Sequence, residues 1–161
     1  MEAPTPSVDV SLASTVVLDA RPLSKIVHPR EFENITEWFG RVVEAGYRVA
    51  IPEVVDYEVR RGLLRIPARK QLEELDALGD AFYLIPLSRS IMQDAAHVWA
   101  KARNAGRPFT SDDRLDGDAI LIAQTRALGS LEQIAVITEN VQHLAPFVPA
   151  VRWQNFEIED G

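Results

Sequence analysis

The sequence contains no cysteine. This absence excludes a disulfide framework, a thiolate metal site and a cysteine nucleophile. Long apolar runs are also missing, and none approaches the ~20 residues that a membrane-spanning helix needs. Residues 1–14 show neither the basic start nor the apolar stretch of a signal peptide, so we expect a flexible leader there. Together these absences predict a cytoplasmic protein with no membrane segment.

Basic charge is scarce: the chain has 24 acidic and 17 basic residues, for a formal net charge of -7. Proteins that bind phosphate backbones without specificity usually present a basic face, so this balance argues against such binding. An enzyme that acts on nucleic acid is still compatible with it, because local basic clusters and bound cations offset the overall field. The densest basic stretch has the composition of a phosphate-binding surface or of an ordinary solvated helix face: Arg60, Arg61, Arg65, Arg69 and Lys70.

Strand-like and helical segments alternate along the 161 residues. Short aliphatic runs predict strands at 15–20, 47–52, 81–86 and 133–138, with a fifth at 150–153. Helical spacing predicts helices at 30–46, 53–64, 68–80, 88–106 and 118–129, and the polar stretch 106–117 predicts a loop. Strands that alternate with helices form βαβ units. We therefore predict an α/β fold, a three-layer α/β/α sandwich with a central parallel sheet of about five strands. A single domain would span 15–156, followed by a tail at 157–161.

Carboxylates fall at the ends of predicted strands and near the starts of predicted helices. Asp19 closes the first strand, Glu58 lies in the second turn of the helix after strand two, and "TEN" (138–140) closes strand four. Asp116 and Asp118 open the helix before strand four. In open parallel sheets ligands bind beyond the carboxyl ends of the strands, so these acids could converge at one edge. Because clustered carboxylates repel each other, they would take up protons unless a cation such as Mg²⁺ or Mn²⁺ lies between them.

Each acid also has a simpler explanation. An Asp at a strand end often only forms a turn. Glu58 lies close in sequence to Arg60 and Arg61, where a solvated ion-pair lattice would be ordinary. Asp116 could cap a helix, with Asp118 a first-turn acid favoured by the helix dipole. These explanations weaken when taken jointly, because the acids recur at the edge where the fold predicts a site.

Four segments, in the right order, resemble the motifs of the PIN-domain family, the fold of VapC-like toxin ribonucleases. They are "VVLDARPL" (16–23), "IPEVVDYEVRRGLL" (51–64), "LDGDAILIAQTRALG" (115–129) and "AVITEN" (135–140) with "VQHLAPF" after it. In the family, an Asp ends the first strand, a Glu lies on the next helix, and an Asp opens a later helix. The resemblance assigns these positions to Asp19, Glu58 and Asp118. Where many members carry a fourth Asp, this chain has Asn140, and Asp116 would complete the acidic set instead.

The resemblance implies a metal-dependent endoribonuclease that uses Mg²⁺ or Mn²⁺ to hydrolyse RNA phosphodiester bonds. The catalytic and metal-binding residues would be Asp19, Glu58, Asp116 and Asp118. The residues expected to contact the substrate are Arg21, Arg61, Thr138 and Asn140. The family further implies that the chain is the toxin of a toxin–antitoxin pair, with an antitoxin protein as partner, and that it forms a homodimer.

Two other interpretations stay open. One is a PIN fold used mainly for binding or assembly, although the retained Asp19, Glu58 and Asp118 argue against it. The other is a response-regulator receiver domain, which is also a five-stranded α/β fold with acids at strand ends. A receiver domain needs an acceptor Asp after strand three, where this chain reads "LIPLS" (84–88). It also needs a Lys after strand five, where this chain reads "VRWQN" (151–155).

Overall fold

The computed structural model describes residues 9–105 and 112–159, with only the helical backbone for residues 112–115. The first eight residues of the predicted leader, the first six of the predicted loop at 106–117 and the last two of the predicted tail lie outside the described residues. Within the described part of the chain, no helix is both long and apolar enough to cross a membrane.

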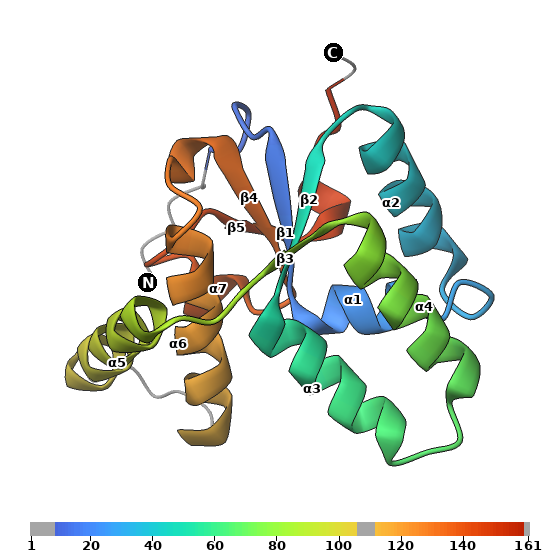
Figure 1. Ribbon diagram of the computed structural model, residues 1–161. Coiled ribbons are helices and arrows are strands. Elements are labelled where there is room, and N and C mark those ends of the chain that lie inside the picture. The colour runs from blue at the N-terminus through green and yellow to red at the C-terminus, as the bar shows by residue number, and fades with distance from the viewer. Residues whose placement is uncertain (1–8, 106–111, 160–161) are drawn as a thin grey trace, which may run out of the picture.

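Five parallel strands form one central sheet in the order β3-β2-β1-β4-β5 (Figure 1). The strands are β1 (Thr15–Leu18), β2 (Arg48–Pro52), β3 (Tyr83–Ile85), β4 (Ile134–Ile137) and β5 (Ala150–Val151). The central strands β1 and β4 are almost completely buried, as expected for aliphatic strands that are covered on both faces. The predicted parallel sheet is confirmed.

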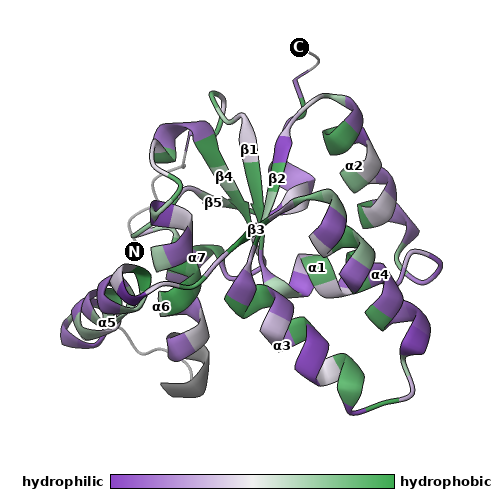
Figure 2. Cartoon of the chain, viewed as in Figure 1, coloured by the Kyte–Doolittle hydropathy of each residue, from purple (hydrophilic) through white to green (hydrophobic). Residues whose placement is uncertain are grey.

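Helices cover both faces of this sheet (Figure 1). On one side lie α1 (Ala20–Ile26), α2 (Glu33–Glu44), α3 (Glu53–Leu64) and α4 (Arg69–Ala81). On the other side lie α5 (Arg89–Asn104), α6 (Asp112–Arg126) and α7 (Val141–Leu144). The strands are mostly apolar, whereas the outer sides of α2 to α5 carry many hydrophilic residues (Figure 2). The three-layer α/β/α sandwich is therefore confirmed as well.

Two short helices, α1 and α7, were not predicted. They contain 7 and 4 residues, too few to show the periodicity of an amphipathic helix. The first strand ends at Leu18 rather than at residue 20, because α1 begins directly after Asp19. Since no loop separates β1 from α1, Asp19 lies at the sheet edge and at the helix start at once.

Helix α6 begins at Asp112, so the loop predicted over 106–117 is wrong for residues 112–117. A glycine inside a helix costs only about 1 kcal/mol, which packing easily offsets, and Gly117 therefore does not stop the helix. The helix is buried on several sides, including the consecutive residues 121–125, so no clear polar face marks where it starts. Asp116 lies in the second turn of α6 and is not its N-cap.

Gln124 holds α6 to the rest of the domain. Its side chain is fully buried, and Nε2 donates to the carbonyl of Ile85, at the end of β3, at 2.6 Å. Its Oε1 accepts from the backbone N–H of Val54, in the first turn of α3, at 3.3 Å. These bonds satisfy the buried amide and fix α6 against the carboxyl ends of β2 and β3. The second turn of α6 is thereby held over the edge where the predicted site lies.

Candidate active site

Asp19 follows directly after β1 and is nearly buried, with 8% of its surface exposed. Its Oδ1 accepts a hydrogen bond from the backbone N–H of Ala20 at 2.7 Å and so caps α1. Its Oδ2 accepts from the hydroxyl of Thr138 at 2.7 Å. Burial raises the pKa of Asp19 above its ordinary value, and the two hydrogen bonds only partly oppose that effect. Asp19 is therefore a fixed carboxylate whose charge is disfavoured by its surroundings.

The position of Asp19 follows from the topology of the sheet. The strand order reverses between β1 and β4. Strands β2 and β3 are added on one side of β1, and the chain then crosses over to add β4 and β5 on the other side. The backbone N–H of Asp19 donates to the carbonyl of Ile137 at 3.0 Å, which joins the two strand ends. Ligands of open α/β sheets bind at such a switch point. The predicted edge is thus the place that this fold offers for a site.

Thr138 has a different role from the expected one of substrate contact. Thr138 is only 1% exposed, and its hydroxyl donates a hydrogen bond to Asp19. The same oxygen accepts from the backbone N–H of Asn140 at 2.9 Å. Because the single hydroxyl proton is already used, Thr138 orients Asp19 and has no donor left for a substrate.

Glu58 lies in the second turn of α3 and faces the end of β1. Its pKa is raised, first by burial and then by the negative charge of Asp19, while Arg61 lowers it. The two acids, 39 positions apart in sequence, are therefore close enough for each charge to disfavour the other. The solvated ion-pair lattice considered for Glu58 does form, but without Glu58: Arg60 binds Asp56 at 3.0 Å and Asp76 at 2.8 Å.

The carboxylate of Glu58 lies directly against α6 at Gly117. A Cβ placed on Gly117 would overlap with Glu58 Oε1 and would lie 3.3 Å from Glu58 Cδ. The glycine in "LDGD" therefore lets the acid of α3 approach the backbone of α6 between Asp116 and Asp118. The position of this glycine is explained by close approach rather than by a turn.

The two acids beside Gly117 differ in their surroundings. Asp118 is half-buried on the turn of α6 that contacts Glu58. Asp116 is exposed and lines an open groove of about 390 Å³ between α5 and α6, together with Met92 and Trp99. Within residues 9–105 and 112–159, no group of three or more His or acidic side chains is arranged to hold a metal ion. The geometry thus joins Asp19 to Glu58 and leaves the ligand roles of Asp116 and Asp118 as predictions.

The donor set nevertheless fits a divalent cation. Asp19 and Glu58 are oxygen donors of like charge. Burial raises the pKa of both, Glu139 adds to the effect at Asp19, and the charge of Asp19 adds to it at Glu58. A pair of this kind is stabilised either by a shared proton or by a cation. Mg²⁺ and Mn²⁺ prefer carboxylate oxygen and are typically bound by one or two carboxylates plus water. Asp19, held by two hydrogen bonds, and Glu58, which lies against α6, therefore offer the type of oxygen donor that such an ion takes.

The remaining predicted residues border this pair. Arg21, on α1, is well exposed and forms an ion pair with Glu139 at 3.4 Å. Arg61 stacks over the ring of Tyr57, with its guanidinium carbon 5.2 Å from the ring centroid, and its charge reaches Glu58. Asn140 is exposed at the start of α7. These three side chains reach solvent, so each is available to a ligand at the sheet edge.

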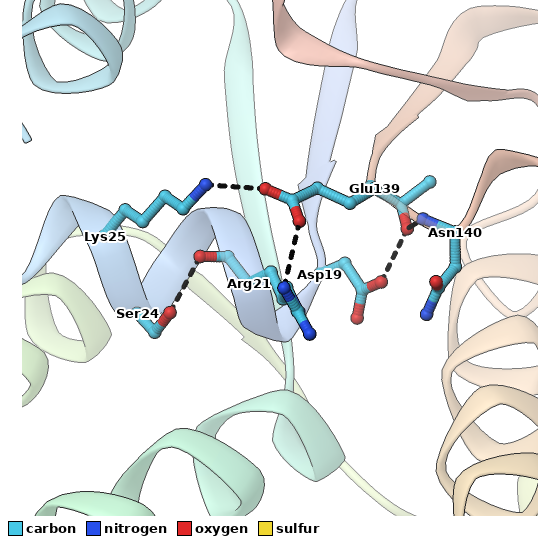
Figure 3. A network of polar contacts seen from close by, with 7 residues as sticks. Asp19, Arg21, Ser24, Lys25, Glu139 and Asn140 are labelled. Atoms are coloured by element: carbon cyan, nitrogen blue, oxygen red, sulfur yellow. Dashed lines mark hydrogen bonds and ion pairs between the residues drawn. The ribbon is translucent and has the colours of Figure 1, made fainter.

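Glu139 lies in the "TEN" segment that the sequence places at the sheet edge, but its contact with Lys25 was not predicted. Lys25 Nζ donates to Glu139 Oε1 at 2.6 Å (Figure 3). The Lys25 hydrogen bond, followed by the charges of Lys25, Arg21 and Arg152, holds the pKa of Glu139 below its ordinary value. The spacing of Arg21 and Lys25, four residues apart, would have indicated a shared helix face if α1 had been predicted.

The chain resembles a known family in sequence and solved proteins in fold. The family model described as the PIN domain matches residues 16–142. No curated protein matches the sequence. Among solved structures, VapBC-1 from nontypeable Haemophilus influenzae has a TM-score of 0.64 and 14% identity, covering 88% of this chain and 99% of its own. FitAcB from Neisseria gonorrhoeae has a TM-score of 0.62 and 14% identity, with the same coverage of 88% and 99%.

A third similar structure is VapBC2 from Rickettsia felis bound to a DNA fragment from their promoter. It has a TM-score of 0.61 and 16% identity, covering 86% of this chain and 98% of its own. At these identities the structural matches establish the fold. The family itself rests on the family model, which spans most of the chain.

The contact at Gly117 leads to a first prediction. In Gly117→Ala the new methyl displaces the Glu58 carboxylate, and the fold is retained because the end of that side chain can swing aside. We expect the apparent affinity for Mg²⁺, measured by thermal shift, to fall by at least about tenfold.

The matched control is Gly40→Ala in α2, where the added Cβ meets nothing within 4 Å. That variant should keep the Mg²⁺ response of the wild type and gain up to about 1 kcal/mol of stability. An unchanged Mg²⁺ response in Gly117→Ala would contradict the assigned role of the glycine.

The raised pKa of Glu58 leads to a second prediction, on stability against pH. The folded protein binds the Glu58 proton more tightly than the unfolded chain does, so in EDTA the unfolding free energy falls as pH rises from about 4.3 through the raised pKa. Glu58→Gln removes this titration. We expect its melting temperature to exceed that of the wild type at pH 8, and the difference to close toward pH 4.

Glu73→Gln, at an exposed ion pair with Arg69 on α4, serves as the control and should follow the pH profile of the wild type. Parallel pH profiles for Glu58→Gln and the wild type would show that the Glu58 charge is not disfavoured in the folded protein.

Proposed function

Because this chain belongs to the PIN-domain family, we propose that it is a metal-dependent endoribonuclease. The observation that supports this proposal most strongly is the pair of carboxylates, buried Asp19 and half-buried Glu58, at the switch point of the parallel sheet. Carboxylates whose ionisation is disfavoured are typical of functional sites, because such a pair does not stabilise the fold. This pair also lies at the edge of the sheet where ligands of such folds bind. The substrate would be RNA, cleaved at its phosphodiester bonds.

Asp19 and Glu58 would bind Mg²⁺ or Mn²⁺ directly, with Asp118 on the adjacent turn of α6 as a third ligand and Asp116 as an outer one. When bound, the cation supplies positive charge that favours deprotonation of water near neutral pH and offsets charge on the phosphate. Thr138 keeps Asp19 in one orientation by its hydrogen bond. Gly117 leaves room for Glu58. Arg21, Arg61 and Asn140 would contact phosphate oxygens or the flanking nucleotides.

We further propose that the chain is the toxin of a toxin–antitoxin pair and acts in the cytoplasm. Support comes from the structural neighbours, which are the complexes VapBC-1, VapBC2 and FitAcB. This proposal includes an antitoxin protein as the partner of the chain and assembly of the chain into a homodimer. Co-expression with the protein encoded next to it, followed by purification of the complex, would test the first of these.

The central prediction is divalent-metal-dependent cleavage of single-stranded RNA by the purified chain. EDTA should abolish cleavage, and added Mg²⁺ or Mn²⁺ should restore it. Asp19→Asn, Glu58→Gln and Asp118→Asn should each lower the cleavage rate by at least about 100-fold, since even outer partners of metal ligands contribute 10- to 100-fold.

Asp80→Asn is the matched control, because it removes an exposed carboxylate near the end of α4. It should cleave RNA at the rate of the wild type. Cleavage that persists in Asp19→Asn, or that survives EDTA, would refute the nuclease assignment. Metal binding without any cleavage would favour the alternative of a PIN fold kept for binding or assembly.

A further inference from the structure

Beside Asp19 lies a group of charged side chains that we call the Glu139 cluster: Arg21, Lys25, Glu139 and Arg152. Figure 3 shows Glu139 pointing toward α1, where Lys25 and Arg21 meet its two carboxylate oxygens at 2.6 Å and 3.4 Å. Arg152, just after β5, is close enough for its charge to lower the pKa of Glu139 as well. One carboxylate thus gathers cations from two separate elements.

The charge balance of this cluster differs from that of three other ion-paired groups in the described part of the chain. At Glu139, three cations surround one carboxylate, which leaves a net positive charge. At Arg60 the balance is reversed, because one cation lies between Asp56 and Asp76. The pairs Arg69–Glu73 and Arg126–Asp94 are neutral. Although the chain has a net charge of -7, this cluster therefore has an excess of positive charge next to the candidate active site.

The cluster also lies between two open depressions of the surface. Glu139, Asn140 and Arg152 line one of about 390 Å³. Lys25 lines another of about 510 Å³, together with Phe32 and Trp153. Since Lys25 and Glu139 contact each other, their ion pair joins the two depressions. This surface adjoins the strand edge at Asp19, on which the charges of Glu139 and Arg21 both act.

We propose that Glu139 is a positioning residue that gathers Arg21, Lys25 and Arg152 into a binding site for the backbone phosphates of single-stranded RNA. The proposal rests on the proposed function and adds to it the path of the substrate strand. Without Glu139, three like charges from α1 and the end of β5 would repel one another and spread. With it, they are held together and still carry enough positive charge to attract a phosphodiester.

Binding of RNA under increasing salt tests the proposal without any need for cleavage. A short single-stranded RNA is titrated with the full chain in EDTA at several salt concentrations. Each cation that neutralises a phosphate contributes about 0.7 to the slope of log K against log salt. We expect Arg21→Ala, Lys25→Ala and Arg152→Ala each to lower the slope by about that amount. Arg69→Ala, which removes an exposed arginine on α4, should leave it unchanged.

The variant Glu139→Gln distinguishes a positioning role of Glu139 from the effect of its negative charge on RNA binding. This variant adds one positive charge, so charge alone predicts tighter RNA binding. If Glu139 positions the cations, binding should weaken at least threefold despite the added charge. Glu73→Gln makes the same change of charge at the exposed pair on α4 and should bind RNA as tightly as the wild type or slightly more tightly. Thermal melting of each variant verifies that it is folded.

The outcomes distinguish this inference from the proposed nuclease activity. Lowered slopes in the three cation variants, together with weaker binding by Glu139→Gln, support the inference even if no RNA is cleaved. Cleavage of RNA with unchanged slopes overturns the inference and leaves the nuclease assignment standing. Tighter binding by Glu139→Gln overturns the positioning role, and absence of salt-dependent RNA binding by the wild type overturns the binding site.

Discussion

The repulsion between two carboxylates, buried Asp19 and half-buried Glu58, is the constraint on which the rest of the site depends. Burial is the main cause that disfavours ionisation of both groups, and the negative charge of Asp19 further disfavours ionisation of Glu58. A protein selected only for stability would replace one of them by a neutral residue. Their joint presence at the switch point of the sheet is the observation on which the proposed cation site rests.

The scaffold keeps this pair together through contacts that come from distant parts of the chain. Thr138, directly after β4, orients Asp19 by a hydrogen bond. Gly117 gives Glu58 room against α6, and Gln124 fixes that helix to the ends of β2 and β3. All of these contacts lie at the carboxyl edge of the sheet. Of the four buried polar residues in the described part of the chain, Asp19, Gln124 and Thr138 thus form or support the site.

Much of this organisation is predictable from the sequence, and the limits have physical causes. The alternation of aliphatic and amphipathic runs is enough for the parallel sheet and the sandwich, because both depend on local periodicity. The start of α6 was misplaced, since a helix buried on several sides has no clear polar face and an interior glycine resembles a turn. Thr138 was expected at the substrate because a sequence does not show which way a hydroxyl points. The contact between Glu139 and Lys25 was missed because it joins residues that are 114 positions apart and because α1 was not predicted.

The central claim is that Asp19 and Glu58 form one electrostatically coupled site that a divalent cation completes. The most direct test is a carbon-13 NMR titration of the two side-chain carboxyl groups, in EDTA and again with saturating Mg²⁺. The claim predicts that both pKa values lie above the ordinary ~3.9 for Asp and ~4.3 for Glu in EDTA and fall when Mg²⁺ is added. Ordinary pKa values that Mg²⁺ does not move would contradict it.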